Sequence, residues 1–162
     1  MSRGGVFAYG THAVVIAVDP DSGIVELLKY VVSEDCGTMI NPMIVDGQVV
    51  GGIAQGIGTA LYEEIPYTAA GQPLTASLAD YIVPTADAMP FIQLEHLVTP
   101  ALITEYGVKG LGEGGAIAPP AAIANAVADA FADIRVSFDE TPLTPGRVAE
   151  AIARARGKMV KR

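Results

Sequence analysis

Two neighbouring segments near the beginning of the chain are apolar and rich in β-branched residues, and the first of them partly alternates with polar residues. Residues 11–19 read THAVVIAVD and residues 24–32 read IVELLKYVV, with the turn residues DPDSG between them. Alternating β-branched runs joined by a short turn are typical of an antiparallel hairpin. The same alternation in FIQLEHLV, at residues 91–98, predicts a further strand, in which His96 is a packed or hydrogen-bonded side chain and not a ligand.

A helical repeat lies between these strands. Asn41 is a suitable cap and Pro42 a suitable first residue for a helix over residues 44–64, where apolar residues recur at 45, 49, 53, 57 and 61. The same segment contains glycines at 47, 51, 52, 56 and 58. Each glycine costs about 1 kcal/mol relative to alanine in a helix interior. The pattern therefore indicates that another group needs close access to this backbone.

The remaining segments predict shorter elements. Four prolines in residues 65–90 indicate an ordered excursion, with a single turn of helix near residues 77–81. Pro119 and Pro120 open an alanine-rich helix, DIRVSF at residues 133–138 predicts a strand, and a last helix is expected at residues 144–155, before a solvated basic tail. Together these patterns predict an α+β fold in one domain over residues 1–162, with mixed short strands and two to three helices.

The composition of the chain further indicates that it binds another polypeptide. The chain is 51% hydrophobic and only 17% charged, whereas about a quarter of the residues of a typical domain are charged. We interpret the excess of hydrophobic residues as surface that docks on another polypeptide. The net charge of −8 disfavours nucleic acid as a ligand. No apolar run is long enough to span a membrane and residues 1–10 lack a signal-peptide core, so we expect a cytoplasmic protein. The one cysteine, Cys36, excludes an internal disulfide and is expected to be a small buried apolar residue.

The glycine-rich helix is the first candidate site. Six of its residues share one face by helical spacing: Gln48, Gly51, Gly52, Gln55, Gly58 and Thr59. Two amides on a flat face suit a ligand rich in hydrogen-bond donors and acceptors, such as a pterin edge or a phosphate. The alternative is close packing of another backbone across the glycines, and spacing alone favours that alternative.

The second candidate site is the stretch YGVKGLGEGGAIAPP at residues 106–120. Its glycines free the backbone for close approach, and Glu113 is held between them, where a carboxylate can act as a general base. A surface turn is the alternative. GLGEGG also spells the dinucleotide fingerprint, but no buried strand precedes it, two prolines follow it, and Glu113 would repel a pyrophosphate. We therefore expect no dinucleotide binding.

Two stretches together resemble a known family. They are VVSEDCGTMINPMIVDGQVVGGIAQGIGTALYEE at residues 31–64 and EYGVKGLGEGGAIAPPAAIANAVADA at residues 105–130. Both are similar to the C-terminal part of the molybdopterin-binding large subunit in the xanthine oxidase family of molybdenum hydroxylases. This family includes xanthine dehydrogenases, aldehyde oxidoreductases and aerobic carbon monoxide dehydrogenases. The resemblance extends over residues 9–155, in the family's order and approximate separation.

The resemblance implies a role for particular residues. Glu113 is implied to be the general base beside the molybdenum, for oxidation of a small substrate at an electron-poor carbon with oxygen derived from water. Gln48 is implied to hydrogen-bond the molybdopterin, with backbone amides of Gly51, Gly52, Gly112, Gly114 and Gly115 helping to hold it. The pterin dithiolene binds the metal, so no protein metal ligand is expected. A cytosine dinucleotide form of the pterin is expected from bacterial members.

The length of the chain departs from the family pattern, because family large subunits are several times longer. The chain is then a separately encoded piece of a split subunit, a C-terminal fragment, or a truncated reading frame. We expect it to be inactive without the rest of the large subunit. Its expected partners are that remainder, an iron–sulfur subunit and, in many members, a FAD subunit. The alternative is a non-catalytic structural or interaction fragment of such a subunit.

Overall fold

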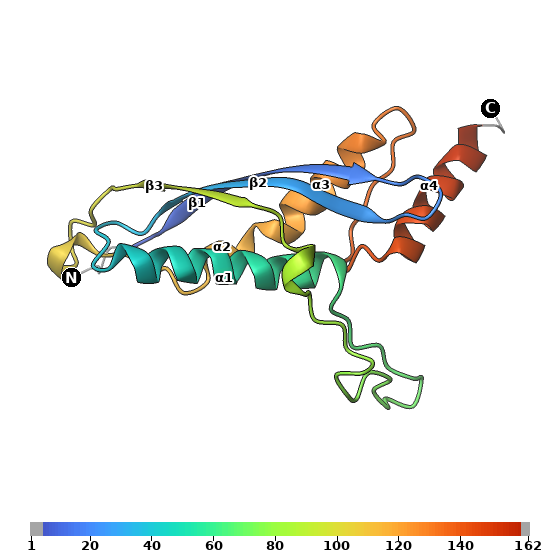
Figure 1. Ribbon diagram of the computed structural model, residues 1–162, viewed down its shortest axis with the longest axis horizontal. Coiled ribbons are helices and arrows are strands. Elements are labelled where there is room, and N and C mark those ends of the chain that lie inside the picture. The colour runs from blue at the N-terminus through green and yellow to red at the C-terminus, as the bar shows by residue number, and fades with distance from the viewer. Residues whose placement is uncertain (1–4, 160–162) are drawn as a thin grey trace.

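A computed structural model of the protein describes residues 5–159, with the side chains of residues 158 and 159 outside that description. Strands β1 (Tyr9–Val18), β2 (Val25–Asp35) and β3 (Ile92–Leu97) form one sheet in that order. β1 and β2 pair antiparallel, whereas β2 and β3 pair parallel. The helix α1 (Pro42–Leu61) runs along one side of the sheet, and residues 62–85 extend away from the rest of the fold (Figure 1). The predicted α+β fold is confirmed.

The predicted hairpin is confirmed, and its turn is built as the sequence suggests. Asp19 Oδ1 accepts a hydrogen bond from the backbone N–H of Asp21 at 2.9 Å, and Gly23 adopts a positive φ of 74°. The strands are 10 and 11 residues long and therefore longer than expected. A register shift between Val15 and Ile16 interrupts their ladder. The hairpin is thus a long, irregular ribbon that reaches from one end of the fold to the other.

The helix α1 begins as predicted and ends three residues earlier. Pro42 is its first residue, and the Asn41 side chain accepts a hydrogen bond from the backbone N–H of Ile44 at 3.4 Å. At the other end, the backbone N–H groups of Tyr62 and Glu63 both donate to the carbonyl of Gly58. This shared acceptor breaks the regular helical ladder. The chain therefore leaves the helix before residue 64.

Close backbone packing explains some of the glycines of α1. A Cβ atom at Gly52 would lie 3.0 Å from Gly115 Cα, in the short helix α2 (Gly114–Ile117). A Cβ atom at Gly56 would lie 2.6 Å from Pro119 Cγ, where α3 (Pro119–Ala130) begins. Access for a cofactor therefore does not account for all five glycines. Gly47 and Gly51 face open space in the described structure.

The core fills the space between the sheet and the helices. Tyr30 and Val32 from the inner face of β2 are fully buried. They pack with residues of α1, α3 and α4 (Pro145–Met159), namely Val49, Ile53, Ile57, Ile123, Val127, Val148 and Ile152. Four elements, β2, α1, α3 and α4, thus share one cluster, which fixes α1 and α3 against the sheet.

The predicted strand at residues 133–138 is wrong. Residues 131–135 form turns, and Arg135 has a positive φ of 55°, which a strand residue does not adopt. The apolar residues that suggested a strand still serve the core, because Val136 is buried and Phe138 packs against the cluster. The turn predicted at residues 77–81 is a single turn, and a short 3₁₀ helix, η1 (Ala86–Ala88), follows it.

The last helix and the surface complete the fold. α4 continues to Met159, beyond the predicted end at residue 155, and residues 160–162 of the basic tail lie outside the described residues. Within residues 5–159, no helix combines the length and the apolar character needed to cross a bilayer. Cys36 is buried, as expected.

The glycine contacts predict opposite effects of the same substitution. In Gly115→Ala, the new Cβ would lie 2.3 Å from the carbonyl oxygen of Val49, which is backbone and cannot rotate away. We expect the free energy of unfolding to fall by about 1–3 kcal/mol. In Gly47→Ala, the Cβ enters open space and the free energy of unfolding should rise by about 1 kcal/mol. Urea unfolding followed by circular dichroism measures both, and equal stability of the two variants would contradict the packing account.

Candidate functional site

The glycine-rich helix and the glycine-rich loop meet in the structure. Gln48 Nε2 donates a hydrogen bond of 2.7 Å to the carbonyl oxygen of Gly112, across 64 positions of sequence. Gln48, Gly112 and Glu113 are all exposed. The two candidate sites of the sequence therefore form one surface, with the amide from α1 on one side and the carboxylate from the loop on the other.

Glu113 stands immediately before α2 with a free carboxylate. Its backbone carbonyl accepts a hydrogen bond from Ala116 at 2.9 Å, which fixes the backbone, but its side chain does not cap the helix. No residue of the described structure forms a hydrogen bond or an ion pair with this carboxylate. Both oxygens are therefore available to accept a proton from a group outside this chain.

The predicted glycine face of α1 is divided between solvent and core. Gly51 is exposed, and a Cβ atom there would lie in open space. On the same side of the helix, three further residues are exposed: Gln48, Gln55 and Thr59. Gly52 and Gly58 are buried. They therefore do not lie on the accessible face, although helical spacing had placed them there. In the loop, Gly112 is open whereas Gly115 packs against Val49. Of the predicted cofactor glycines, Gly51 and Gly112 have the freest access.

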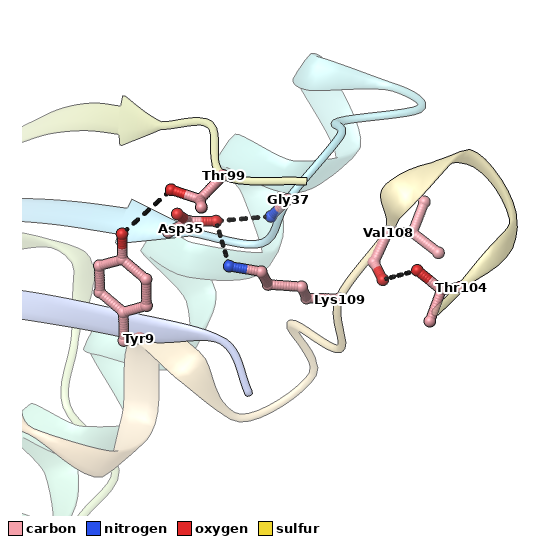
Figure 2. Close-up of polar contacts among 7 residues, drawn as sticks. All are labelled: Tyr9, Asp35, Gly37, Thr99, Thr104, Val108 and Lys109. Carbon is pink, nitrogen blue, oxygen red and sulfur yellow. Dashed lines mark hydrogen bonds and ion pairs between the residues drawn. The ribbon is translucent and has the colours of Figure 1, made fainter. Parts of the chain in front are cut away.

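A buried ion pair lies behind the loop, and the sequence reading missed it. Lys109 Nζ and Asp35 Oδ1 are 3.1 Å apart, with 8% of the lysine side chain and none of the aspartate exposed. The same Asp35 oxygen accepts a 2.7 Å hydrogen bond from the backbone N–H of Gly37 (Figure 2). Asp35 ends β2 and Lys109 precedes Glu113 by four residues. The only signal in the sequence was a charged residue at the end of an apolar strand.

The surroundings of Asp35 favour its charged form. Burial alone raises the pKa of this carboxyl, but the Thr99 hydroxyl, the Gly37 N–H, the Lys109 ammonium and the Tyr9 hydroxyl outweigh it. The two hydroxyls lie beside the carboxylate and are 3.2 Å from each other, although Oδ2 itself accepts no hydrogen bond of ordinary geometry. The net effect holds the pKa of Asp35 well below its usual range.

A second buried carboxylate lies under the loop. Glu34 Oε1 is 3.1 Å from His12 Nε2, and His12 Nδ1 is 2.9 Å from the Tyr30 hydroxyl. A Cβ atom at Gly114 would lie 3.2 Å from Glu34 Oε2, so the carboxylate touches the residue after Glu113. Burial, together with the nearby Glu34 charge, raises the pKa of Tyr30 above its usual range. Two adjacent acidic residues of β2 are thus buried beside the loop, Asp35 at Lys109 and Glu34 at Gly114.

The remaining polar residues have structural partners. His96 Nε2 is 2.7 Å from Asp46 Oδ1 of α1, so the expectation of a hydrogen-bonded side chain is confirmed. Within the part of the chain that the structure describes, no three histidine, cysteine or acidic residues are grouped so that they could hold a metal ion. The chemistry of this surface therefore rests on Glu113, the Gln48 amide and the open backbone.

Comparison with known proteins identifies the family. The sequence profile described as the molybdopterin cofactor-binding domain matches residues 2–90, more than half of the chain. The chain belongs to the molybdopterin cofactor-binding domain family. The resemblance to the molybdenum hydroxylases of the xanthine oxidase family is thereby confirmed.

Individual relatives extend this match through the Glu113 loop. The large subunit of nicotine 6-hydroxylase from Paenarthrobacter nicotinovorans is 44% identical over 90% of this chain and 18% of its own length. The carbon monoxide dehydrogenase large chain of Hydrogenophaga pseudoflava is 34% identical over 90% of this chain and 18% of its own. The crystal structure of quinoline 2-oxidoreductase from Pseudomonas putida 86 is 44% identical, with a TM-score of 0.86 over 89% of this chain and 18% of that one. This chain thus spans less than a fifth of the length of these relatives.

The charge on Asp35 predicts a pH dependence of stability. Because its pKa is lower in the folded state, its stabilising effect is complete above the unfolded-state pKa of about 3.9. That effect is lost as pH falls from there toward the folded-state pKa. Urea unfolding of the parent chain and of Asp35→Asn should show a stability gap at pH 6–7 that narrows below about pH 4. A gap that stays constant down to pH 2.5 would show that Asp35 does not remain ionised in the folded protein.

Proposed function

We propose that this chain forms one wall of the active site of a molybdenum hydroxylase, with Glu113 as the general base and Gln48 as a cofactor ligand. The hydrogen bond between Gln48 and Gly112 is the observation that supports the proposal most directly. It brings an amide, open glycine backbone and an unpaired carboxylate onto one exposed surface. Membership of the molybdopterin cofactor-binding domain family, and 44% identity to a nicotine 6-hydroxylase large subunit and to a quinoline 2-oxidoreductase, support the chemistry proposed for this surface.

The residues of this surface fit molybdopterin. Gln48 uses one N–H for Gly112, so its carbonyl oxygen and second N–H remain for the donor and acceptor groups of a pterin. A flat ligand can approach the backbone at Gly51 and Gly112 without meeting a side chain, and the amide of half-buried Gly114 is proposed to contribute beside them. Gly52 and Gly115 are buried against neighbouring backbone, so their proposed part is to bring the helix and the loop together and not to face the ligand. When bound, the cofactor supplies two-electron redox chemistry through a molybdenum held by the pterin dithiolene. The cytosine dinucleotide form is part of the proposal.

Glu113 is proposed to accept a proton during the reaction. A carboxylate oxygen that takes the proton of a water-derived nucleophile leaves an oxygen able to attack an electron-poor carbon. Such a base must be held still without being neutralised by a partner. The backbone bond to Ala116 fixes Glu113, while its carboxylate forms no ion pair with a described residue. A positioned general base contributes about 10²- to 10⁴-fold to a rate.

The substrate class follows from the relatives as a proposal. Two relatives at 44% identity carry the names of nicotine and quinoline, which are nitrogen heteroaromatics. Ring nitrogen withdraws electrons from the neighbouring carbons and so creates the electron-poor carbon that this chemistry requires. We therefore propose a small nitrogen-containing aromatic substrate for the assembled enzyme.

The surface around the start of α1 is proposed to dock on the rest of a large subunit. Ile40, Met43 and Ile44 are 71%, 77% and 64% exposed and lie four to eight residues before Gln48 in the sequence. An apolar surface at the edge of a site is typical of an interface. The remaining large subunit, an iron–sulfur subunit and a FAD subunit are the proposed partners, and a cytoplasmic location is part of the proposal.

Glu113→Gln tests the proposed base. The amide keeps the shape of the side chain but cannot accept the proton, so we expect reduction of molybdenum by substrate to slow by about 10²- to 10⁴-fold. Molybdenum and pterin content of the assembled enzyme should be unchanged. Stopped-flow absorbance measures the rate, and Glu105→Gln, an exposed glutamate of the same loop, is the control. A rate near that of the parent would remove the base assignment.

Gln48→Ala tests the proposed cofactor ligand. Loss of the amide removes bonds to the pterin and also frees Gly112, so we expect the purified assembled enzyme to retain several-fold less molybdenum and pterin. Metal analysis and pterin fluorescence measure the content. Gln93→Ala removes an exposed amide from β3 and should leave the content unchanged. Equal cofactor content in both variants would show that Gln48 is not a ligand.

Purification with the products of neighbouring genes separates the proposal from its alternative. An active-site wall predicts a complex that contains molybdenum and pterin in proportion to this chain. A structural or interaction fragment predicts a complex without them.

A further inference from the structure

The buried pair of Asp35 and Lys109 ties the end of β2 to the loop that carries Glu113 (Figure 2). We propose that these two residues are positioning residues, which hold Glu113 in place for its reaction. This inference rests on the proposed role of Glu113 as the general base. Neither residue is proposed to touch substrate or cofactor.

Lys109 is fixed through both its backbone and its side chain. Its backbone N–H donates to the carbonyl of Cys36 at 2.8 Å, next to the residue that its ammonium contacts. The ammonium also lies 5.0 Å from the centre of the Tyr9 ring. Tyr9 at the start of β1, Asp35 at the end of β2 and Cys36 just after it thus hold one lysine. Lys109 is therefore a fixed point, although it belongs to an irregular segment.

The segment between Lys109 and Glu113 depends on its two ends. Gly110 and Gly112 have no neighbouring atoms within 4 Å of the place where a Cβ would lie, but the Leu111 side chain between them packs against the hydrophobic core. The next fixed point is the Gly112 carbonyl, which accepts the bond from Gln48. Only Gly110 and Leu111 lie between the two anchors. A shift of Lys109 would therefore reach Glu113, because so short a span, in which Leu111 is packed against the core, can absorb little of it.

Hydrogen bonds hold the segment that precedes Lys109. Thr104 Oγ1 donates to the Val108 carbonyl at 2.8 Å (Figure 2). The Gly107 carbonyl accepts from the backbone N–H of Ala101 at 2.9 Å and of Thr38 at 3.3 Å. Tyr106 adopts a positive φ of 60°, which this network maintains. These hydrogen bonds fix the path along which the chain reaches Lys109. The ion pair between Asp35 and Lys109 then fixes the position from which the chain continues to Glu113.

Burial explains why a charged pair suits this function. A buried ion pair adds little net stability, because desolvation of both charges offsets their attraction, but it accepts few alternative geometries. The Asp35 oxygen needs both the Gly37 N–H and the Lys109 ammonium. An apolar pair could stabilise the fold equally well and still let the loop slide. The pair is therefore suited to fixing position more than to adding stability.

The double variant Asp35→Asn with Lys109→Met tests this inference in the assembled enzyme. Removing both charges avoids an unpaired buried charge, so the variant should assemble. We expect kcat about tenfold or more below that of the parent, with KM, molybdenum and pterin content unchanged. Hydrogen exchange at residues 108–116 should be several-fold faster, while exchange in α3 and α4 stays at the parent rate.

A matched control removes another ion pair. Glu64→Gln with Arg147→Met breaks the half-exposed pair between the segment after α1 and the start of α4, which includes no residue of the loop. This control should keep the parent kcat and the parent exchange at residues 108–116. Lys109→Gln is the second variant where the double variant does not assemble, because its amide can still donate to Asp35. It should show the same changes to a smaller extent.

The outcomes separate this inference from the proposed function. Parent-like kcat or parent-like exchange in the double variant, alongside an inactive Glu113→Gln, overturns the positioning role and leaves the base assignment standing. Full turnover by Glu113→Gln overturns the base assignment and the positioning role with it. Slower kcat, faster loop exchange and unchanged KM together support the inference. With Lys109→Gln as the test, parent-like values of both kcat and exchange overturn it.

Discussion

The contact between the backbones of α1 and α2 is the constraint on which the site depends. Gly52 faces Gly115 at a distance that leaves no room for a Cβ atom, and Gly115 in turn lies against the Val49 carbonyl. This contact places the start of α2 directly beside α1. Gln48, one turn earlier on α1, then reaches Gly112, and Glu113 emerges at the junction. The same close approach that fills the core thus creates the surface proposed for the cofactor.

Two buried carboxylates at the end of β2 provide the second support of this region. Glu34 points to the inner face of the sheet, beneath Gly114, and is held by His12. Its neighbour Asp35 is held by Lys109 and the Gly37 N–H. Buried charges are tolerated only where hydrogen bonds replace water. The arrangement therefore uses costly groups in one place, next to the loop whose position matters for the proposed chemistry.

The helix α1 has a buried side and an exposed side, and the exposed side belongs to the surface proposed for the cofactor. The helix α1 buries Val49, Ile53 and Ile57 on one side and exposes Gly47, Gly51 and Gln55 on the other. Along one helix, small residues serve two purposes. Gly52 and Gly56 admit neighbouring backbone, whereas Gly51 leaves space for a ligand in the proposed function. A glycine count alone does not distinguish these purposes.

Local sequence patterns determined much of this protein. Alternation over residues 11–32 and 91–98, the Asn41 cap with Pro42, and the Pro119–Pro120 start correctly predicted three strands and the helices α1 and α3. The resemblance predicted the family and selected Gln48 and Glu113, whose roles remain predictions. The strand expected at residues 133–138 was wrong, because its apolar residues reach the core from turns and alternation does not report φ.

Only the tertiary structure decided how the site is assembled. The pairs Gln48 with Gly112, Asp35 with Lys109, and Gly52 with Gly115 join residues that are at least 60 positions apart. Helical spacing placed Gly51 and Gly52 on one face, yet packing buries one and exposes the other. A local pattern fixes the conformation of a segment and which side chains share a face. What each face meets depends on how distant segments pack, and that is settled only when the whole core forms.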